Sequence, residues 1–115
     1  MTDHGTVRAA LLELHKELLQ AQRLEVERFG GRMSAGEVLQ AAADDLRFSW
    51  LRTLSQLIAE LDAADEPDEI TAVITRAREL LAPPDPDTTF GARYLKALQD
   101  HPAVVMAHRD VVATL

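Results

Sequence analysis

The segment DLRFSWLRTLSQLIAEL, residues 45–61, constrains the fold more than any other stretch of this sequence. It contains the only Trp of the chain and one of its three Phe residues. At about 100° per residue, its large apolar side chains share one broad arc, and Phe48, Ser55 and Ala59 form a second contact face. We therefore expect a central helix over about residues 45–61, whose main arc contains Leu46, Trp50, Leu51, Leu54, Leu57, Ile58 and Leu61.

The remaining sequence is predicted to supply the helices that surround this segment. Its 115 residues are typical of one domain that can bury a core without disulfides or metals. A hydrophobic content of 47%, only five Gly and five Pro, and many Ala, Leu, Glu and Arg residues favour helix. We therefore predict an all-α, single-domain bundle of five to six helices over residues 1–115, with residues 1–5 forming a frayed N-terminus.

Capping residues and breakers mark the expected helix ends. Gly30 and Gly31 end the first helix, and Ser34 with Glu37 forms a capping-box signature for the second. Pro67 suits a first helical position, as does the Pro at residue 102. Asp44 or Asp45 is expected to cap the central helix, and Thr88 or Thr89 the fifth. The predicted helices cover residues 6–29, 35–43, 45–61, 67–82, a segment after 88, and a segment from 102 onward.

The net charge of −7 comes mostly from six acidic residues between positions 60 and 69. Much of this cluster suits helix initiation beside Pro67, and the alternative is an acidic edge that binds a partner. Its spacing does not match a calcium loop. An acidic chain without a basic stripe is a poor candidate for nucleic-acid binding. The lack of a signal peptide or spanning segment, together with the absence of Cys, favours a cytoplasmic protein without membrane contact.

Several polar residues fall where the helical pattern calls for apolar ones. His15, Gln22 and Glu25 lie within the apolar arc of the first helix, and His108 lies at the centre of the arc of the last. Buried polar groups without partners cost about 1–3 kcal/mol, so these side chains are expected to find partners. Arg47 and Arg52 lie beside the core arc of the central helix, from which either could reach Glu25.

This polar cluster has two interpretations. In the first, it is a satisfied network that fixes helix register, or the edge of an interface with a second subunit. In the second, His15 and His108 flank a pocket as acid/base or anchoring groups, and Arg47 or Arg52 holds an anion. The Glu-x-x-His signature of di-iron bundles is absent, since Leu12 and Val105 occupy the expected Glu positions. No zinc-hydrolase, nucleophile-elbow or nucleotide-binding motif occurs either, so we predict no metal, cofactor or catalytic residue.

Four segments of the sequence, residues 14–19, 48–58, 93–99 and 107–108, carry a resemblance to known proteins and support the prediction of helices. The chain resembles a family of short bacterial helical proteins with an F-x-W-L-R-x-L-S-x-L-I segment and no assigned activity. Where that family leads us to expect an acidic residue and an aromatic in the first helix, this chain has Gln22 and Val26. The resemblance implies a bacterial cytoplasmic protein and assigns no catalytic residue.

Two functions follow from these observations. The first is a non-enzymatic interaction protein that forms a homodimer, because the apolar arcs of the first and central helices exceed what short neighbouring helices would cover. An unknown protein partner is a further possibility for such a surface. The second is a ligand-binding or catalytic bundle built on the His, Arg and Glu cluster.

Overall fold

The computed structural model describes residues 3–115, which form six α-helices, one 3-10 helix and no strand. The all-helical bundle predicted from the sequence is therefore confirmed. The elements are α1 (His4–Gly30), α2 (Ala35–Asp44), η1 (Leu46–Leu51), α3 (Arg52–Ala63), α4 (Pro67–Leu81), α5 (Thr89–Asp100) and α6 (Pro102–Thr114).

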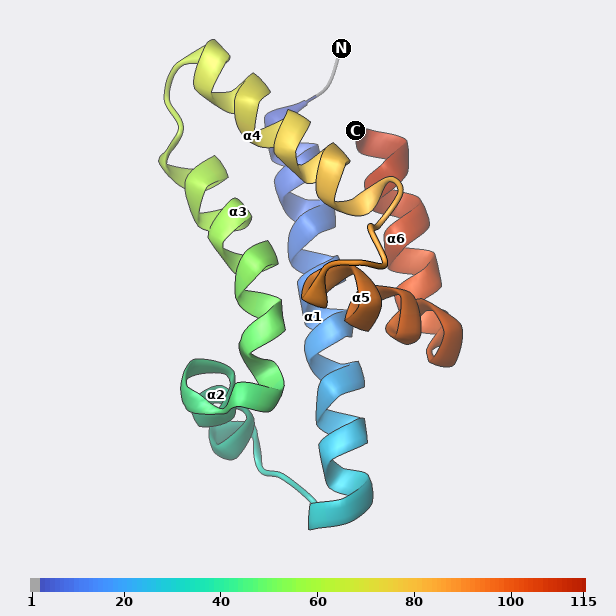
Figure 1. Ribbon diagram of the computed structural model, residues 1–115. Coiled ribbons are helices and arrows are strands. Elements are labelled where there is room, and N and C mark those ends of the chain that lie inside the picture. Colours follow the sequence, from blue (N-terminus) through green and yellow to red (C-terminus); the bar gives the residue numbers. More distant parts are fainter. Residues whose placement is uncertain (1–2) are drawn as a thin grey trace.

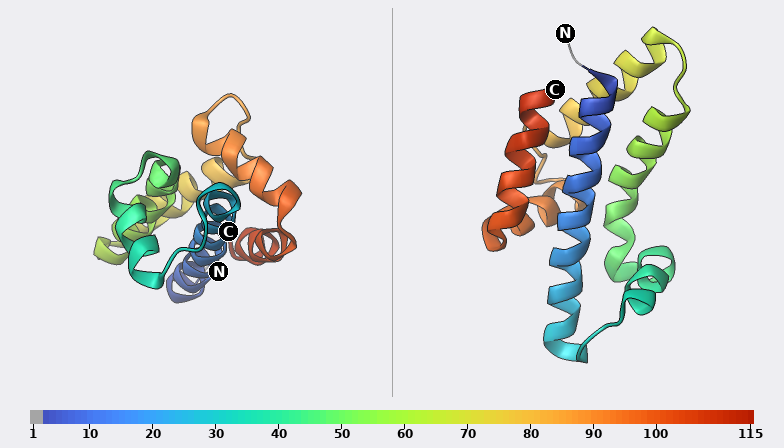
Figure 2. Two further views of the ribbon diagram at one scale, coloured as in Figure 1. Left: turned by 90° about the horizontal axis from the view of Figure 1, so that it is seen from below. Right: turned by 180° about the vertical axis from the view of Figure 1, so that it is seen from behind.

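Three helices form a layer that two others cross. The longest helix, α1, lies between α3 and α6, and α6 runs antiparallel to it (Figure 1). Helices α4 and α5 cross the same face of this layer, which leaves the opposite face of α1 uncovered by helices (Figure 2). Helix α2 packs mainly against η1, at the end of the molecule away from both termini. The molecule measures 45 × 26 × 23 Å.

The core is one hydrophobic cluster to which all six α-helices contribute. The segment 45–61 flanks α1, and from Trp50 onward the predicted arc is buried. Two details of its prediction are wrong. Leu46 is 84% exposed, because it begins a 3-10 helix whose three residues per turn differ from the α-helical period. Ser55 and Ala59 are exposed, and only Phe48 of the second contact face is buried.

The predicted caps explain most helix ends. Ser34 and Glu37 form both hydrogen bonds of the capping box, at 3.1 and 3.2 Å. Gly31 follows α1 with φ of 81°, a conformation that favours glycine. The Asp45 carboxylate accepts from the Arg47 amide at 2.8 Å, and the Thr88 hydroxyl accepts from the amide of residue 91 at 2.9 Å. These bonds satisfy backbone amides that have no partner within the helix.

The N-terminus is more ordered than a frayed end over its described part. Residues 1–2 of the segment predicted to fray lie outside the described residues. Helix α1 starts at His4, two residues before the predicted start, and the Asp3 carboxylate caps it by accepting from the Gly5 amide at 3.3 Å. His4 Nε2 lies 3.1 Å from the carbonyl oxygen of Leu61 in α3. The first turn is thus tied to a neighbouring helix.

Candidate functional site

Gln22 is the only buried amide or charged side chain between residues 3 and 115, with 5% of its surface exposed. Its Oε1 atom accepts a 2.9 Å hydrogen bond from Trp50 Nε1, which joins α1 to η1. A buried indole N–H needs such a partner, because leaving it unbonded would cost desolvation free energy. The polar position in the first helix is thus explained by the single Trp.

An aromatic row runs from Trp50 across α5 to α6. The Trp50 and Phe90 ring centroids are 5.7 Å apart, and those of Phe90 and Tyr94 are 5.4 Å apart. The Tyr94 and His108 rings follow at 5.5 Å, with the hydroxyl oxygen 2.6 Å from His108 Nδ1. These spacings fall within the favourable range of about 4.5–7 Å for aromatic pairs. The row therefore links three elements through packing and ends in a polar contact on each side.

The Tyr94–His108 contact has a defined direction of donation. Burial raises the pKa of Tyr94, so its hydroxyl keeps its proton. Burial also lowers the pKa of His108, which favours the neutral ring. The hydroxyl therefore donates to Nδ1, and the ring proton of His108 sits on Nε2. This arrangement is a stable structural bond between α5 and α6.

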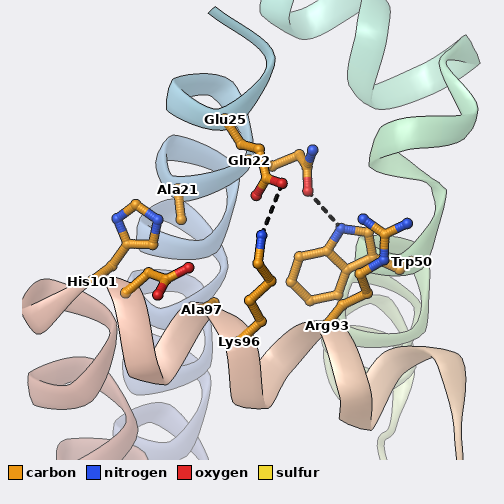
Figure 3. Close-up of a pocket in the computed structure, with 9 residues that line it drawn as sticks. Ala21, Gln22, Glu25, Trp50, Arg93, Lys96, Ala97 and His101 are labelled. Carbon is orange, nitrogen blue, oxygen red and sulfur yellow. Dashed lines mark hydrogen bonds and ion pairs between the residues drawn. The ribbon is translucent and has the colours of Figure 1, made fainter. Parts of the chain in front are cut away.

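A small cavity opens beside the Gln22–Trp50 bond (Figure 3). Its volume is about 20 Å³, which is room for about one water molecule. Glu25 and Lys96 form an ion pair at its edge, with 3.0 Å between Oε1 and Nζ. Gln22 Nε2 makes no hydrogen bond to another described residue, and no fully buried side-chain nitrogen or oxygen between residues 3 and 115 lacks a partner, so Nε2 is reached by solvent. The remaining polar lining residues are Arg93, Asp100 and His101.

The structure does not gather the predicted cluster into one pocket. Gln22 and Glu25 border the cavity, whereas His108 lies at the far end of the aromatic row. His15 is half-buried, has no side-chain hydrogen bond within residues 3–115, and has a pKa lowered by burial. No hydrogen bond joins it to His108 among the described residues.

Neither predicted arginine reaches Glu25. Arg47 pairs with Asp45 at 2.6 Å, because this carboxylate caps the same turn and lies only two residues away. Arg52 donates to the carbonyl oxygen of Ala43 at 2.5 Å and is exposed. Both guanidinium groups therefore serve the local α2–η1 connection, and Glu25 pairs instead with Lys96 of α5.

Three members of the site were not singled out from the sequence. They are Phe90 and Tyr94 of the aromatic row and Lys96 of the ion pair with Glu25. One signal was present, since a Tyr on an apolar face needs a partner for its hydroxyl. His108 occupied the matching position in the next helix. Lys96 carried no comparable signal, because its partner Glu25 is 71 residues away.

A second candidate site is the surface that we call the α2 end. It consists of the last turn of α1, the linker, α2 and the start of η1, at the bottom of Figure 1. Phe29 is 89% exposed, Leu39 75% and Leu46 84%, whereas no other large hydrophobic residue between positions 3 and 115 exceeds 50%. A concentration of exposed apolar side chains marks interaction surfaces.

No protein-family model, curated protein or solved structure matches this chain. The family resemblance stays a prediction. In the part of the chain that the structure describes, no group of three or more His, Asp or Glu side chains is placed to hold a metal ion. None of the described helices combines the length and the apolar character that crossing a membrane requires.

Proposed function

We propose that this chain is a small non-enzymatic interaction protein of the bacterial cytoplasm, that it forms a homodimer, and that the α2 end is the contact surface. The observation that carries the proposal is the exposure of Phe29, Leu39 and Leu46 at this one end. Burying such side chains against a partner removes apolar surface from water, which favours association. The bacterial and cytoplasmic part of the proposal rests on the family resemblance alone.

The exposed apolar surface that supports self-association is not the one that the sequence predicted. The apolar arc of the central segment was expected to need a second subunit, yet Leu54, Leu57, Ile58 and Leu61 are buried within one copy. The excess apolar surface lies at the α2 end instead. The alternative function, a ligand-binding or catalytic pocket, has less support, because the cavity beside Gln22 has room for only about one water.

Sedimentation velocity of the full chain tests the proposal at protein concentrations from about 1 to about 100 µM. We expect a monomer–dimer equilibrium that Phe29→Ala shifts toward monomer, with a Kd raised about tenfold or more, as for an interface aromatic. Met106→Ala is the matched control, because Met106 is a half-exposed apolar residue of α6, away from the α2 end. A wild-type chain that stays monomeric throughout this range would refute the proposed dimer.

A further inference from the structure

The α2 end carries a protruding aromatic side chain, Phe29, and two arginines that lie close to it in the sequence. Phe29 is 89% exposed, and the guanidinium carbon of Arg28 lies 5.9 Å from the centroid of its ring. Arg32 follows in the linker after α1 and is exposed. Neither arginine forms an ion pair with any residue between positions 3 and 115. The pKa of the Glu27 carboxyl is lowered by its hydrogen bond from the Met33 amide and also by the charge of Arg32, but no close ion pair within the described residues holds either Arg28 or Arg32, so both guanidinium groups can contact a partner.

The reason for this exposure lies in the length of α1. Phe29 follows Leu11, Leu18 and Gln22 along the face of α1 that is buried higher in the bundle. Helix α1 extends below α5 and α6, so no helix covers this face at its last turn (Figures 1 and 2). Phe29 therefore has the helical register of a core residue, but its side chain is exposed because no helix packs against it.

The same end carries a shallow groove that combines an apolar floor with acidic residues at its edge. It runs along α2 with a volume of about 380 Å³, and Met33 and Ala41 supply its apolar lining. The groove is shallow and widely open to solvent, so an aromatic side chain of a partner would lie against its apolar floor without being enclosed. The acidic residues at its edge are Glu37, Asp44 and Asp45.

The three acidic residues differ in their hydrogen-bond and ion-pair partners. Glu37 accepts from the Ser34 amide in the capping box, and Asp45 is paired with Arg47. Asp44 accepts from the amide of Gln40 and has no cationic partner between residues 3 and 115. Glu37 and Asp44 therefore both lack a counter-charge between residues 3 and 115, and Asp44 is the one that is not held by the capping box.

We infer that the α2 end is self-complementary and that two copies meet there about a two-fold axis. Phe29 of each copy lies in the α2 groove of the other, and Arg32 of each copy faces Asp44 of the other. In a two-fold interface each contact occurs twice, so a projection and a groove that meet across the axis satisfy each other in both copies, and the dimer closes. This inference rests on the proposed homodimer and specifies its geometry.

The dimensions of the molecule set the strength of this contact. The long axis is 45 Å and the cross-section 26 × 23 Å, so an end-to-end contact involves a small part of the surface. Stable complexes commonly bury about 800 Å² per partner. We therefore expect a weak dimer that depends on few residues and that salt weakens, because its charge pairs lie at a solvent-exposed rim.

A charge-exchange experiment tests the inference by sedimentation velocity of the full chain. Arg32→Glu and Asp44→Arg, made separately, each replace two attractive contacts per dimer with repulsive ones, and we expect each to raise Kd about tenfold. An equimolar mixture of the two variants restores opposite charges at both contacts. We expect this mixture, and the chain that carries both substitutions, to dimerise within about threefold of wild type. Arg109→Glu on α6 is the control and is expected to leave Kd unchanged.

The outcomes separate this inference from the proposed function. If the wild type dimerises and neither single reversal changes Kd, or if the mixture fails to recover, the interface geometry is wrong while the dimer stands. Species larger than a dimer would overturn the two-fold arrangement and indicate head-to-tail association. A monomeric wild type would overturn the proposed function, and the inference with it. Circular dichroism of both variants verifies that they are folded, which we expect because both positions are exposed.

Discussion

Replacing Gly91 by Ala should destabilise the fold although Ala is the better helix former. Gly91 is buried in the first turn of α5, directly beneath the loop that follows α4. A methyl group at this position would lie 1.7 Å from the carbonyl oxygen of Asp85 and 2.8 Å from the Thr88 hydroxyl. Ordinary carbon contacts are about 3.5–4.0 Å, so the Asp85 backbone must move by well over an ångström.

The size of the effect follows from three contributions. Ala in place of Gly favours a helix by about 1 kcal/mol. Forcing a methyl group into a packed site costs about 1–3 kcal/mol, and this clash with backbone belongs at the upper end. Displacing the loop also weakens the Thr88 cap, whose hydroxyl accepts from the Gly91 amide at 2.9 Å and whose loss costs about 1 kcal/mol. We expect a net loss of about 3 kcal/mol in the free energy of unfolding, and a Tm lower by about 10 °C.

Urea unfolding, followed by circular dichroism and by the fluorescence of Trp50, measures this loss. Gly5→Ala and Gly36→Ala are matched controls, since the nearest atoms to a methyl group there are 3.9 and 4.0 Å away. Both lie in helices, so we expect each control to raise stability by up to about 1 kcal/mol. A Gly91→Ala chain as stable as wild type would show that the loop yields freely, and the packing argument would be refuted.

Three further predictions concern the candidate site. Gln22→Leu should cost about 1–3 kcal/mol, because Trp50 Nε1 loses its acceptor, and the free energy of unfolding in urea measures it. Tyr94→Phe should cost about 1 kcal/mol by the same measurement, through loss of the bond to His108. Because burial lowers the pKa of His15 and of His108, these residues bind protons at a higher pH in the unfolded chain than in the folded protein. Stability should thus be complete above about pH 6.5 and fall below it, and replacing both histidines by Gln should flatten this dependence between about pH 7.5 and 5.

The fold was predictable to the extent that its signals are local. The capping box at Ser34, the helix start at Pro67 and the stop at Gly31 act within one helical turn, and the structure has all three. The 3-10 character of η1 was not predictable from periodicity, because a six-residue segment fits three and 3.6 residues per turn nearly equally. Leu46 was misplaced for that reason.

The candidate site was less predictable, because its contacts join distant residues. The apolar face of α1 correctly indicated that Gln22 points inward, yet nothing in the sequence paired it with Trp50 over an interval of 28 residues. For Phe29, the helical pattern favours burial, whereas the structure shows an exposed side chain. Its helical register with the buried Leu11 and Leu18 favours burial, but burial also requires a neighbouring helix, and α1 extends beyond its neighbours at this end. Amphipathic patterns report direction and carry no information about where a bundle stops.

The antiparallel pairing of α1 and α6 also decides how this molecule can be labelled. Leu115 lies toward the end of the molecule opposite the α2 end, so a fluorescent protein fused there leaves the α2 end unobstructed (Figure 1). In a pole-to-pole pair, two such labels would be separated by nearly twice the 45 Å length of one copy. Lateral pairing would bring them within one length. Energy transfer between C-terminal labels can therefore serve as a ruler that reports the orientation of two copies.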